Sequence, residues 1–252
     1  AVMKLVPRPR AYATATLSAR SLPDALVLLN RLQTASGGLV EAFEYMPESY
    51  MRRLAEARPD IRQPFAPRQA TNILVELGST RPADATPGDD GALPLTQLLE
   101  TTLGEMLEEG MVLDAEIAQT EAQRRAMWER RELAAEITVA RQPAIDTDIC
   151  LPTDQVAVFL DRIHVRLPAL DNGAETLSVA HLGDGNIHFT VFPTSDSAAL
   201  YDQVVEAVED EVQAFAQGWA PESEHFPDPR IFCPTEACPL KGATHFSPWA
   251  FL

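Results

Sequence analysis

The chain has 252 residues, of which 46% are hydrophobic and 23% charged, the balance of an ordinary globular protein with a substantial core. A net charge of −17 excludes a nucleic-acid surface and disfavours an anionic membrane surface, because phosphate binding requires clustered Lys and Arg. No apolar run has the length of a membrane span, and no signal peptide opens the sequence. The odd set of Cys150, Cys233 and Cys238 indicates reduced thiols, so the sequence predicts a cytoplasmic protein.

Alternating strand and helix patterns fill the first half of the chain. Ser21, with Pro23 just after it, caps a helix that ends at the Gly37-Gly38 pair. The expected elements are a strand over 11–19, that helix, a strand over 39–45, a helix over 47–58, a strand over 72–77, a helix over 93–109 and a strand from 111. This alternation predicts a ferredoxin-like split β-α-β unit.

The second half shows a looser version of the same unit. The expected elements are a helix over 119–140, a strand over 148–151, a helix over 154–167, a hairpin over 175–192 and a helix over 195–215. Because no linker separates the halves, we expect one α+β domain over residues 1–217, a largely antiparallel sheet with helices packed on one face. Residues 218–252 are rich in Pro and small residues, which predicts an irregular, divergent tail.

The hairpin contains two histidines around the sequence GDGN, namely His181 and His188. Asp184-Gly185 favours a two-residue type I′ turn, which would pair the two histidines directly, with Cβ atoms ~5 Å apart. Strand alternation places Asn186 on the same face. That arrangement suits two ligands of one divalent metal, with a third ligand from elsewhere in the chain. Paired histidines of this kind also occur as surface residues or as hydrogen-bonded core residues.

Several further segments share one known pattern. They are AFEYM over 42–46, LVEL over 74–77, MWERRE over 127–132, DICLP over 148–152 and AHLGDGNIH over 180–188. With these segments, the chain resembles the C-terminal, substrate-side cap domain of the FAD-linked oxidases. That family includes D-lactate dehydrogenase, D-2-hydroxyglutarate dehydrogenase and the glycolate oxidase D subunit. The last segment is close to the family signature Gly-His-x-Gly-Asp-Gly-Asn-x-His.

The resemblance implies a role for individual residues. His181 and His188 would bind a divalent metal, zinc or manganese, beside the flavin, where the metal holds a 2-hydroxy acid. Arg131 would bind the substrate carboxylate, and Asn186 would donate to substrate or flavin. The cofactor FAD would be held mostly by a separate FAD-binding domain, and a homodimer stays open as an oligomeric state.

The sequence also departs from the family pattern. Glu224 would be the third metal ligand and His225 the catalytic base, but this Glu-His pair is displaced and lacks the glycine that follows it in the family. Members that act on dicarboxylates place Thr and Lys where this chain has Ala135 and Asp146, which favours a lactate- or glycolate-like monocarboxylate. The alternative is a catalytically inactive fragment, or an α+β interaction or regulatory module.

Overall fold

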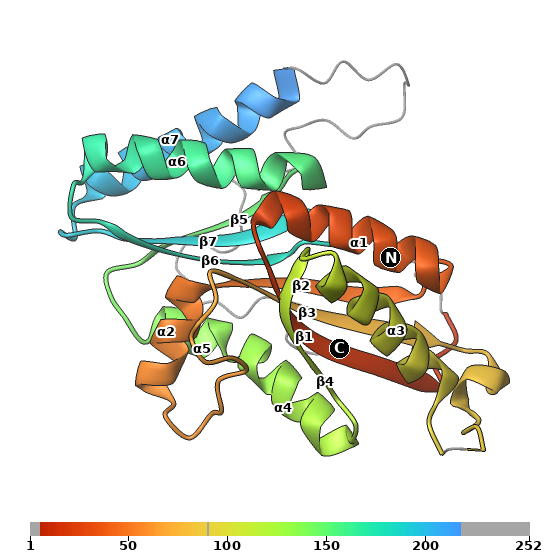
Figure 1. Cartoon of the computed structure of the whole chain (residues 1–252). Helices are drawn as coiled ribbons and strands as arrows, with labels where there is room; N and C mark the ends of the chain where they lie inside the picture. The colour runs from red at the N-terminus through yellow and green to blue at the C-terminus, as the bar shows by residue number, and fades with distance from the viewer. Residues whose placement is uncertain (1–5, 90, 218–252) are drawn as a thin grey trace.

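The computed structural model describes residues 6–89 and 91–217, and its strands lie side by side in one sheet (Figure 1). Neighbouring strands pair antiparallel in the order β4-β1-β3-β2-β6-β7-β5. The strands are β1 (Ala11–Ala19), β2 (Val40–Pro47), β3 (Thr71–Ser79), β4 (Val112–Ile117), β5 (Ile145–Cys150), β6 (Glu175–His181) and β7 (Asn186–Phe192). The helices are α1 (Leu22–Ser36), α2 (Glu48–Ala57), α3 (Pro94–Glu108), α4 (Glu121–Glu132), α5 (Ala134–Val139), α6 (Val156–Leu170) and α7 (Ala198–Gln217). Two 3₁₀ turns, η1 (Pro82–Ala85) and η2 (Thr153–Gln155), lie in the connections.

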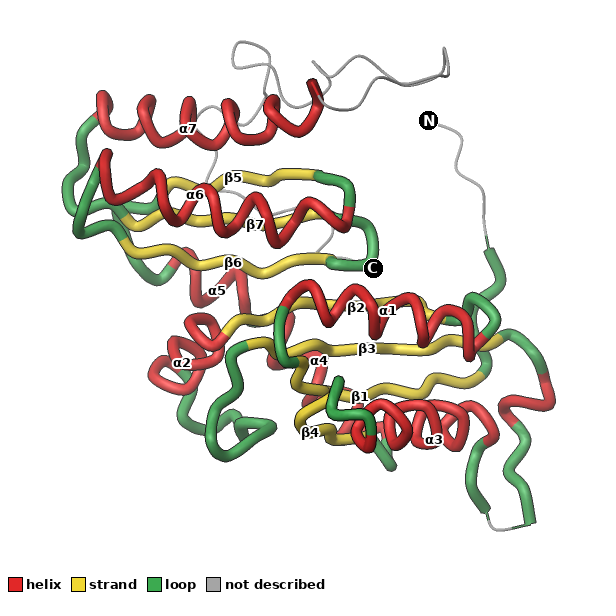
Figure 2. The backbone as a smooth tube through the Cα atoms, turned by 45° about the horizontal axis from the view of Figure 1, so that its top comes forward, coloured by secondary structure: helices red, strands yellow, loops and turns green. Residues whose placement is uncertain are grey.

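The sheet joins a ferredoxin-like unit to a second version of it that has three strands in the described residues, in line with the looser second unit that the sequence predicts. The first unit runs from β1 to β4 and has the strand order β4-β1-β3-β2. In the second unit, β7 lies between β6 and β5, and α6 and α7 pack against each other beside them (Figure 2). The expectation of an α+β fold built as one continuous antiparallel sheet is therefore confirmed.

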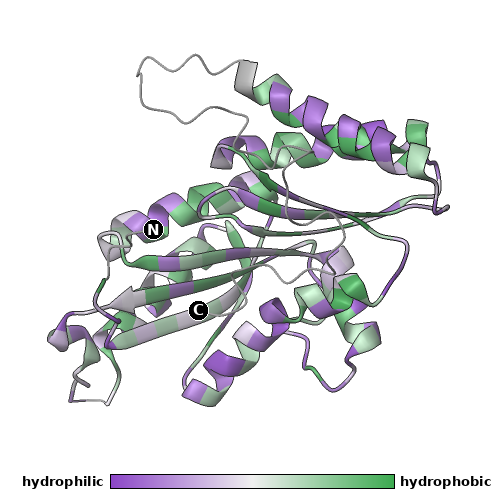
Figure 3. Cartoon of the chain, turned by 180° about the vertical axis from the view of Figure 1, so that it is seen from behind, coloured by the Kyte–Doolittle hydropathy of each residue, from purple (hydrophilic) through white to green (hydrophobic). Residues whose placement is uncertain are grey.

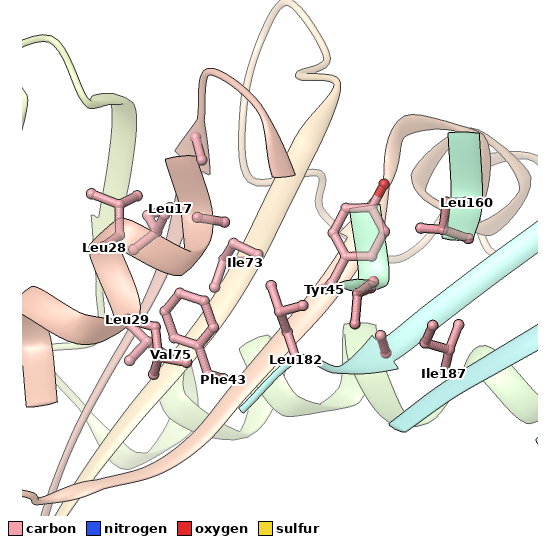
Figure 4. Packing of buried hydrophobic residues seen from close by; sticks show 14 of the residues in the cluster. Leu17, Leu28, Leu29, Phe43, Tyr45, Ile73, Val75, Leu160, Leu182 and Ile187 are labelled. Atoms are coloured by element: carbon pink, nitrogen blue, oxygen red, sulfur yellow. The ribbon is translucent and has the colours of Figure 1, made fainter. Parts of the chain in front are cut away.

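Helices cover both faces of this sheet. The larger core lies under α1, α3, α6 and α7, where Phe43, Tyr45, Leu182 and Ile187 pack together across the two units (Figure 4). A smaller apolar cluster on the other face is formed with α2, α4 and α5. The sequence predicts helices on one face, and the structure adds this second, smaller layer.

The helix expected over 119–140 is divided into α4 and α5. Thr120 and Gln123 form a reciprocal capping box that begins α4. Leu133 lies between the two helices as a turn residue whose backbone stays in the right-handed helical region, with φ −67° and ψ −6°. Because of this break, the short α5 is a separate helix that buries Ala134 and Ile137 in the smaller cluster.

The hairpin differs from the expected two-residue turn. In the observed register His181 lies opposite Asn186, and His188 lies opposite Val179, so the two histidines are diagonal neighbours. A type I′ turn needs positive φ at both central residues, but here Gly185 alone, with φ +77°, adopts it. The predicted pairing of His181 with His188 is therefore wrong. The shift spans two residues, which keeps both histidines and Asn186 on the predicted face.

Candidate active site

The two ferredoxin-like units meet at a narrow junction between β2 and β6. Only two residue pairs form this junction in the described chain, Glu44 with His181 and Tyr45 with Ala180. Because successive side chains alternate across a sheet, Tyr45 and Ala180 enter the larger core, and Glu44 and His181 project from the opposite face. The sheet thus brings an acid and an imidazole together where the two halves of the fold join.

Glu44 links this junction to helix α4. Its side chain is 6% exposed, and its carboxylate accepts a hydrogen bond from Arg131 Nε at 2.9 Å. The same carboxylate lies 2.8 Å from Nδ1 of His181 through Oε2 and 3.0 Å through Oε1. The predicted substrate-binding arginine and one predicted metal ligand are therefore held by a single buried carboxylate.

Arg131 keeps part of its guanidinium free. Its Nη2 atom is buried, and no hydrogen-bond partner for it exists among residues 6–89 and 91–217. Leaving such a buried donor unpaired costs about 1–3 kcal/mol, and more for a charged group. An anionic ligand at this atom would remove that cost.

His188 lies next to His181 and has its own acid. The two imidazole rings are 5.2 Å apart between centroids and nearly perpendicular. Nδ1 of His188 is 3.5 Å from Oδ1 of Asp148, and the Asn186 side-chain amide donates to the same oxygen at 2.7 Å. Burial is the main cause that lowers the pKa of His188, with Asp148 acting in the opposite direction. A neutral imidazole is the form that binds a metal or accepts a proton.

A second buried acid fixes α4 on the same face. Glu76 of β3 accepts two hydrogen bonds from Arg124, both at 2.7 Å, one from the Trp128 indole at 2.9 Å and one from Thr14 at 2.6 Å. Arg124 and Arg131 are seven residues, or two turns, apart, so both reach the sheet from one side of the helix. α4 is largely hydrophilic (Figure 3), and these charged contacts help to hold it on the sheet together with the buried Met127.

These donors fit part of a metal site. Nδ1 of each histidine faces a carboxylate, which leaves the Nε2 atoms for a ligand. Metal-bound histidines usually have their other ring nitrogen beside a carboxylate or carbonyl in the same way. A third ligand is not at hand, since within the described residues no three His, Cys, Asp or Glu side chains form a metal-binding group. Glu224 and His225 lie outside the described residues, and so do Cys233 and Cys238.

Two residues of this site were not predicted. Glu44 and Asp148 both lie in the segments that carry the family resemblance, but neither was given a role. For Glu44 the available signal was an acid inside the apolar segment over 42–46, since a buried carboxylate requires a partner. Asp148 lies opposite His188 in the sheet, a relation that only the strand register reveals.

The comparisons define a class for this chain, that of the C-terminal domains of FAD-linked oxidases. The chain aligns with a crystal structure of p-cresol methylhydroxylase with substrate bound, with a TM-score of 0.51 and 10% identity over 85% of this chain and 45% of that one. This likeness concerns the fold alone. At the level of sequence, the profile of the family "FAD linked oxidases, C-terminal domain" matches residues 8–218, and the chain belongs to that family.

The curated relatives are dehydrogenases of 2-hydroxy acids. A mitochondrial D-2-hydroxyglutarate dehydrogenase of Arabidopsis thaliana is 28% identical over 66% of this chain and 26% of its own length. A D-2-hydroxyglutarate dehydrogenase of Stutzerimonas stutzeri is 25% identical over 76% and 38%, respectively. A mitochondrial Schizosaccharomyces pombe protein with a D-lactate dehydrogenase name is 25% identical over 73% and 35%. The chain thus spans about a third of the length of these relatives.

The relatives also bear on localisation. The plant and fission yeast proteins are named as mitochondrial, and the bacterial relative carries no such term. The prediction of a cytoplasmic protein is therefore wrong, because thiol usage does not distinguish the cytosol from the mitochondrial interior. No helix in the described part of the chain is long and apolar enough to cross a membrane.

Proposed function

We propose that this chain is the substrate-binding part of a flavin-dependent D-2-hydroxy acid dehydrogenase that acts on a small monocarboxylate. The observation that carries the proposal is the buried, unpartnered Nη2 of Arg131 beside two neighbouring imidazoles on one face of the sheet. Membership of the FAD-linked oxidase family and the dehydrogenase names of the relatives support it.

Each polar group has a place in this reaction. Arg131 binds the substrate carboxylate through Nη2, a charge-assisted hydrogen bond in a site shielded from water. His181 and His188 present Nε2 toward the 2-hydroxyl group, either directly or as ligands of zinc or manganese. A metal bound there would lower the pKa of that hydroxyl. A flavin held by an FAD-binding domain would accept the hydride from C2, and a neutral imidazole of this pair would accept the hydroxyl proton.

The substrate class follows from the charges around the site. Asp146, which accepts a hydrogen bond from Thr190 at 2.8 Å, faces the same side of the sheet as Asp148 and His188. These acids repel a second substrate carboxylate, and Ala135 offers no hydrogen bond to one. This argues for a lactate- or glycolate-like substrate, although most of the relatives named above carry the name D-2-hydroxyglutarate dehydrogenase.

The substrate proposal is tested by steady-state kinetics of the holoenzyme that contains this chain and its FAD-binding domain. We expect a higher kcat/KM for D-lactate or glycolate than for D-2-hydroxyglutarate. Arg131→Lys should lower that value by roughly 10- to 100-fold, or ~1.4–2.8 kcal/mol of transition-state stabilisation, because Lys lacks the planar fork. A preference for D-2-hydroxyglutarate, or an Arg131→Lys enzyme with unchanged kcat/KM, contradicts the proposal.

The metal part of the proposal has a separate test. Zinc and manganese content, measured by inductively coupled plasma mass spectrometry, should fall in His188→Ala relative to the wild-type holoenzyme. His164→Ala is a matched control, because that histidine contacts Thr176 of β6, away from the two imidazoles. Equal metal in wild type and His188→Ala would rule out a metal at this pair.

A further inference from the structure

Two buried glutamates of the sheet accept hydrogen bonds from arginines of α4, but they do so in different ways. Glu76 accepts hydrogen bonds from both Nε and Nη2 of Arg124, so its carboxylate binds that guanidinium in a bidentate way. Glu44 accepts a hydrogen bond from Nε of Arg131 only, and both of its carboxylate oxygens also lie near Nδ1 of His181. The difference leaves Arg131 with an open, buried Nη2.

The carboxylate of Glu44 also determines which nitrogen of His181 carries the proton. An ionised carboxylate can only accept hydrogen bonds, and both of its oxygens lie within 3.0 Å of Nδ1. Nδ1 is therefore the donor, and the lone pair of the neutral ring lies on Nε2, away from Glu44. The tautomer of a histidine is set in this way by the hydrogen bond that its other nitrogen makes.

We propose that Glu44 is the positioning residue of this site, which fixes His181 in the Nδ1–H tautomer and orients Arg131 with Nη2 open for one carboxylate. This inference rests on the proposed function and adds a residue to it. Glu44 does not touch the substrate. It acts through Arg131 and His181. Because Glu44 lies at the junction of β2 and β6, it holds both side chains where the two units meet.

The tautomer is measured directly on the isolated chain. Long-range ¹H–¹⁵N spectra of histidine-labelled protein, recorded well above the ordinary imidazole pKa of about 6.5, distinguish Nδ1–H from Nε2–H rings. The His181 signal is assigned with a His181→Gln variant. We expect the Nδ1–H pattern for His181 in the wild type, and an Nε2–H pattern there would overturn the proposal even without any variant.

Variants separate positioning from mere stability. In Glu44→Gln the single acceptor oxygen stays with Arg131, so the amide NH₂ faces His181 and should shift the ring to Nε2–H. Glu44→Asp keeps a carboxylate and should retain the Nδ1–H pattern. Glu76→Gln removes the other buried acid under α4 and should leave the His181 tautomer unchanged. A shift in Glu76→Gln, or none in Glu44→Gln, would contradict the role of Glu44.

The arginine is tested in the holoenzyme. Glu44→Gln should raise KM for D-lactate by about tenfold, because Arg131 loses its fixed orientation, while Glu76→Gln should change that KM by less than about twofold. Equal effects of the two variants on KM would overturn the positioning role. If the holoenzyme oxidises no 2-hydroxy acid at all, the proposed function fails, while the tautomer measurement still decides the role of Glu44.

Discussion

Replacing Glu76 with Gln should destabilise the fold, because Arg124 loses its buried counter-ion and keeps only the exposed Glu121, at 3.5 Å. Glu76 has a side chain that is 5% exposed, and that of Arg124 is 25% exposed. Breaking a fully buried ion pair from one side costs about 3–5 kcal/mol. Water that reaches Arg124 reduces this cost, so we expect a loss of about 2–4 kcal/mol in the free energy of unfolding.

Urea unfolding of the isolated chain measures this loss, and thermal unfolding gives a second readout. At about 2–4 °C per kcal/mol for a chain of this size, the midpoint should fall by roughly 4–16 °C. Glu129→Gln is the control, since that acid lies on the same helix and pairs with Arg58 at the surface at 3.8 Å. Its loss should stay below about 1 kcal/mol. If Glu76→Gln costs no more than the control, electrostatic docking of α4 is refuted.

Two other changes test the turn at Gly185 and the buried imidazole of His164 in α6. Gly185→Ala should lower the free energy of unfolding by about 2–4 kcal/mol, because φ is +77° there and the new Cβ would lie 1.8 Å from the Leu151 carbonyl oxygen. Urea unfolding measures this loss, and a variant as stable as the wild type would refute the prediction. Burial lowers the pKa of His164 in the folded protein, and Asp161 opposes this shift. The folded state therefore gains stability from the neutral ring above the unfolded pKa of about 6.5, and this part of the stability is lost as pH falls through the folded pKa. His164→Gln should flatten that acid-side decline, and an unchanged slope of stability against pH would exclude His164 as its source.

Local patterns were sufficient to predict the elements and the face on which the histidines lie. The Ser21 cap with its glycine stop gave α1, and strand alternation placed His181, Asn186 and His188 together. An error of two residues in the register kept this face, whereas an error of one would have reversed it.

Other features depend on contacts between distant segments. The turn after β6 lies against β2, because the backbone N–H of Gly183 donates a hydrogen bond to the Phe43 carbonyl oxygen at 3.3 Å. This contact favours the longer turn over the expected two-residue turn. The pairing of Glu44 with Arg131 spans 87 positions in the sequence, and local patterns carry no information about it. The break at Leu133 likewise reflects packing of α5 on the sheet, which helix periodicity alone does not show.

We propose above all that Arg131 and the two imidazoles bind a 2-hydroxy acid for oxidation by flavin. The most direct measurement is the rate at which D-lactate bleaches the flavin of the anaerobic holoenzyme in a stopped-flow spectrometer. The account predicts reduction of the wild-type flavin, and a rate in Arg131→Lys that is lower by roughly 10- to 100-fold at subsaturating substrate. A wild-type flavin that stays oxidised with every monocarboxylic 2-hydroxy acid, or equal rates in the two proteins, would contradict it.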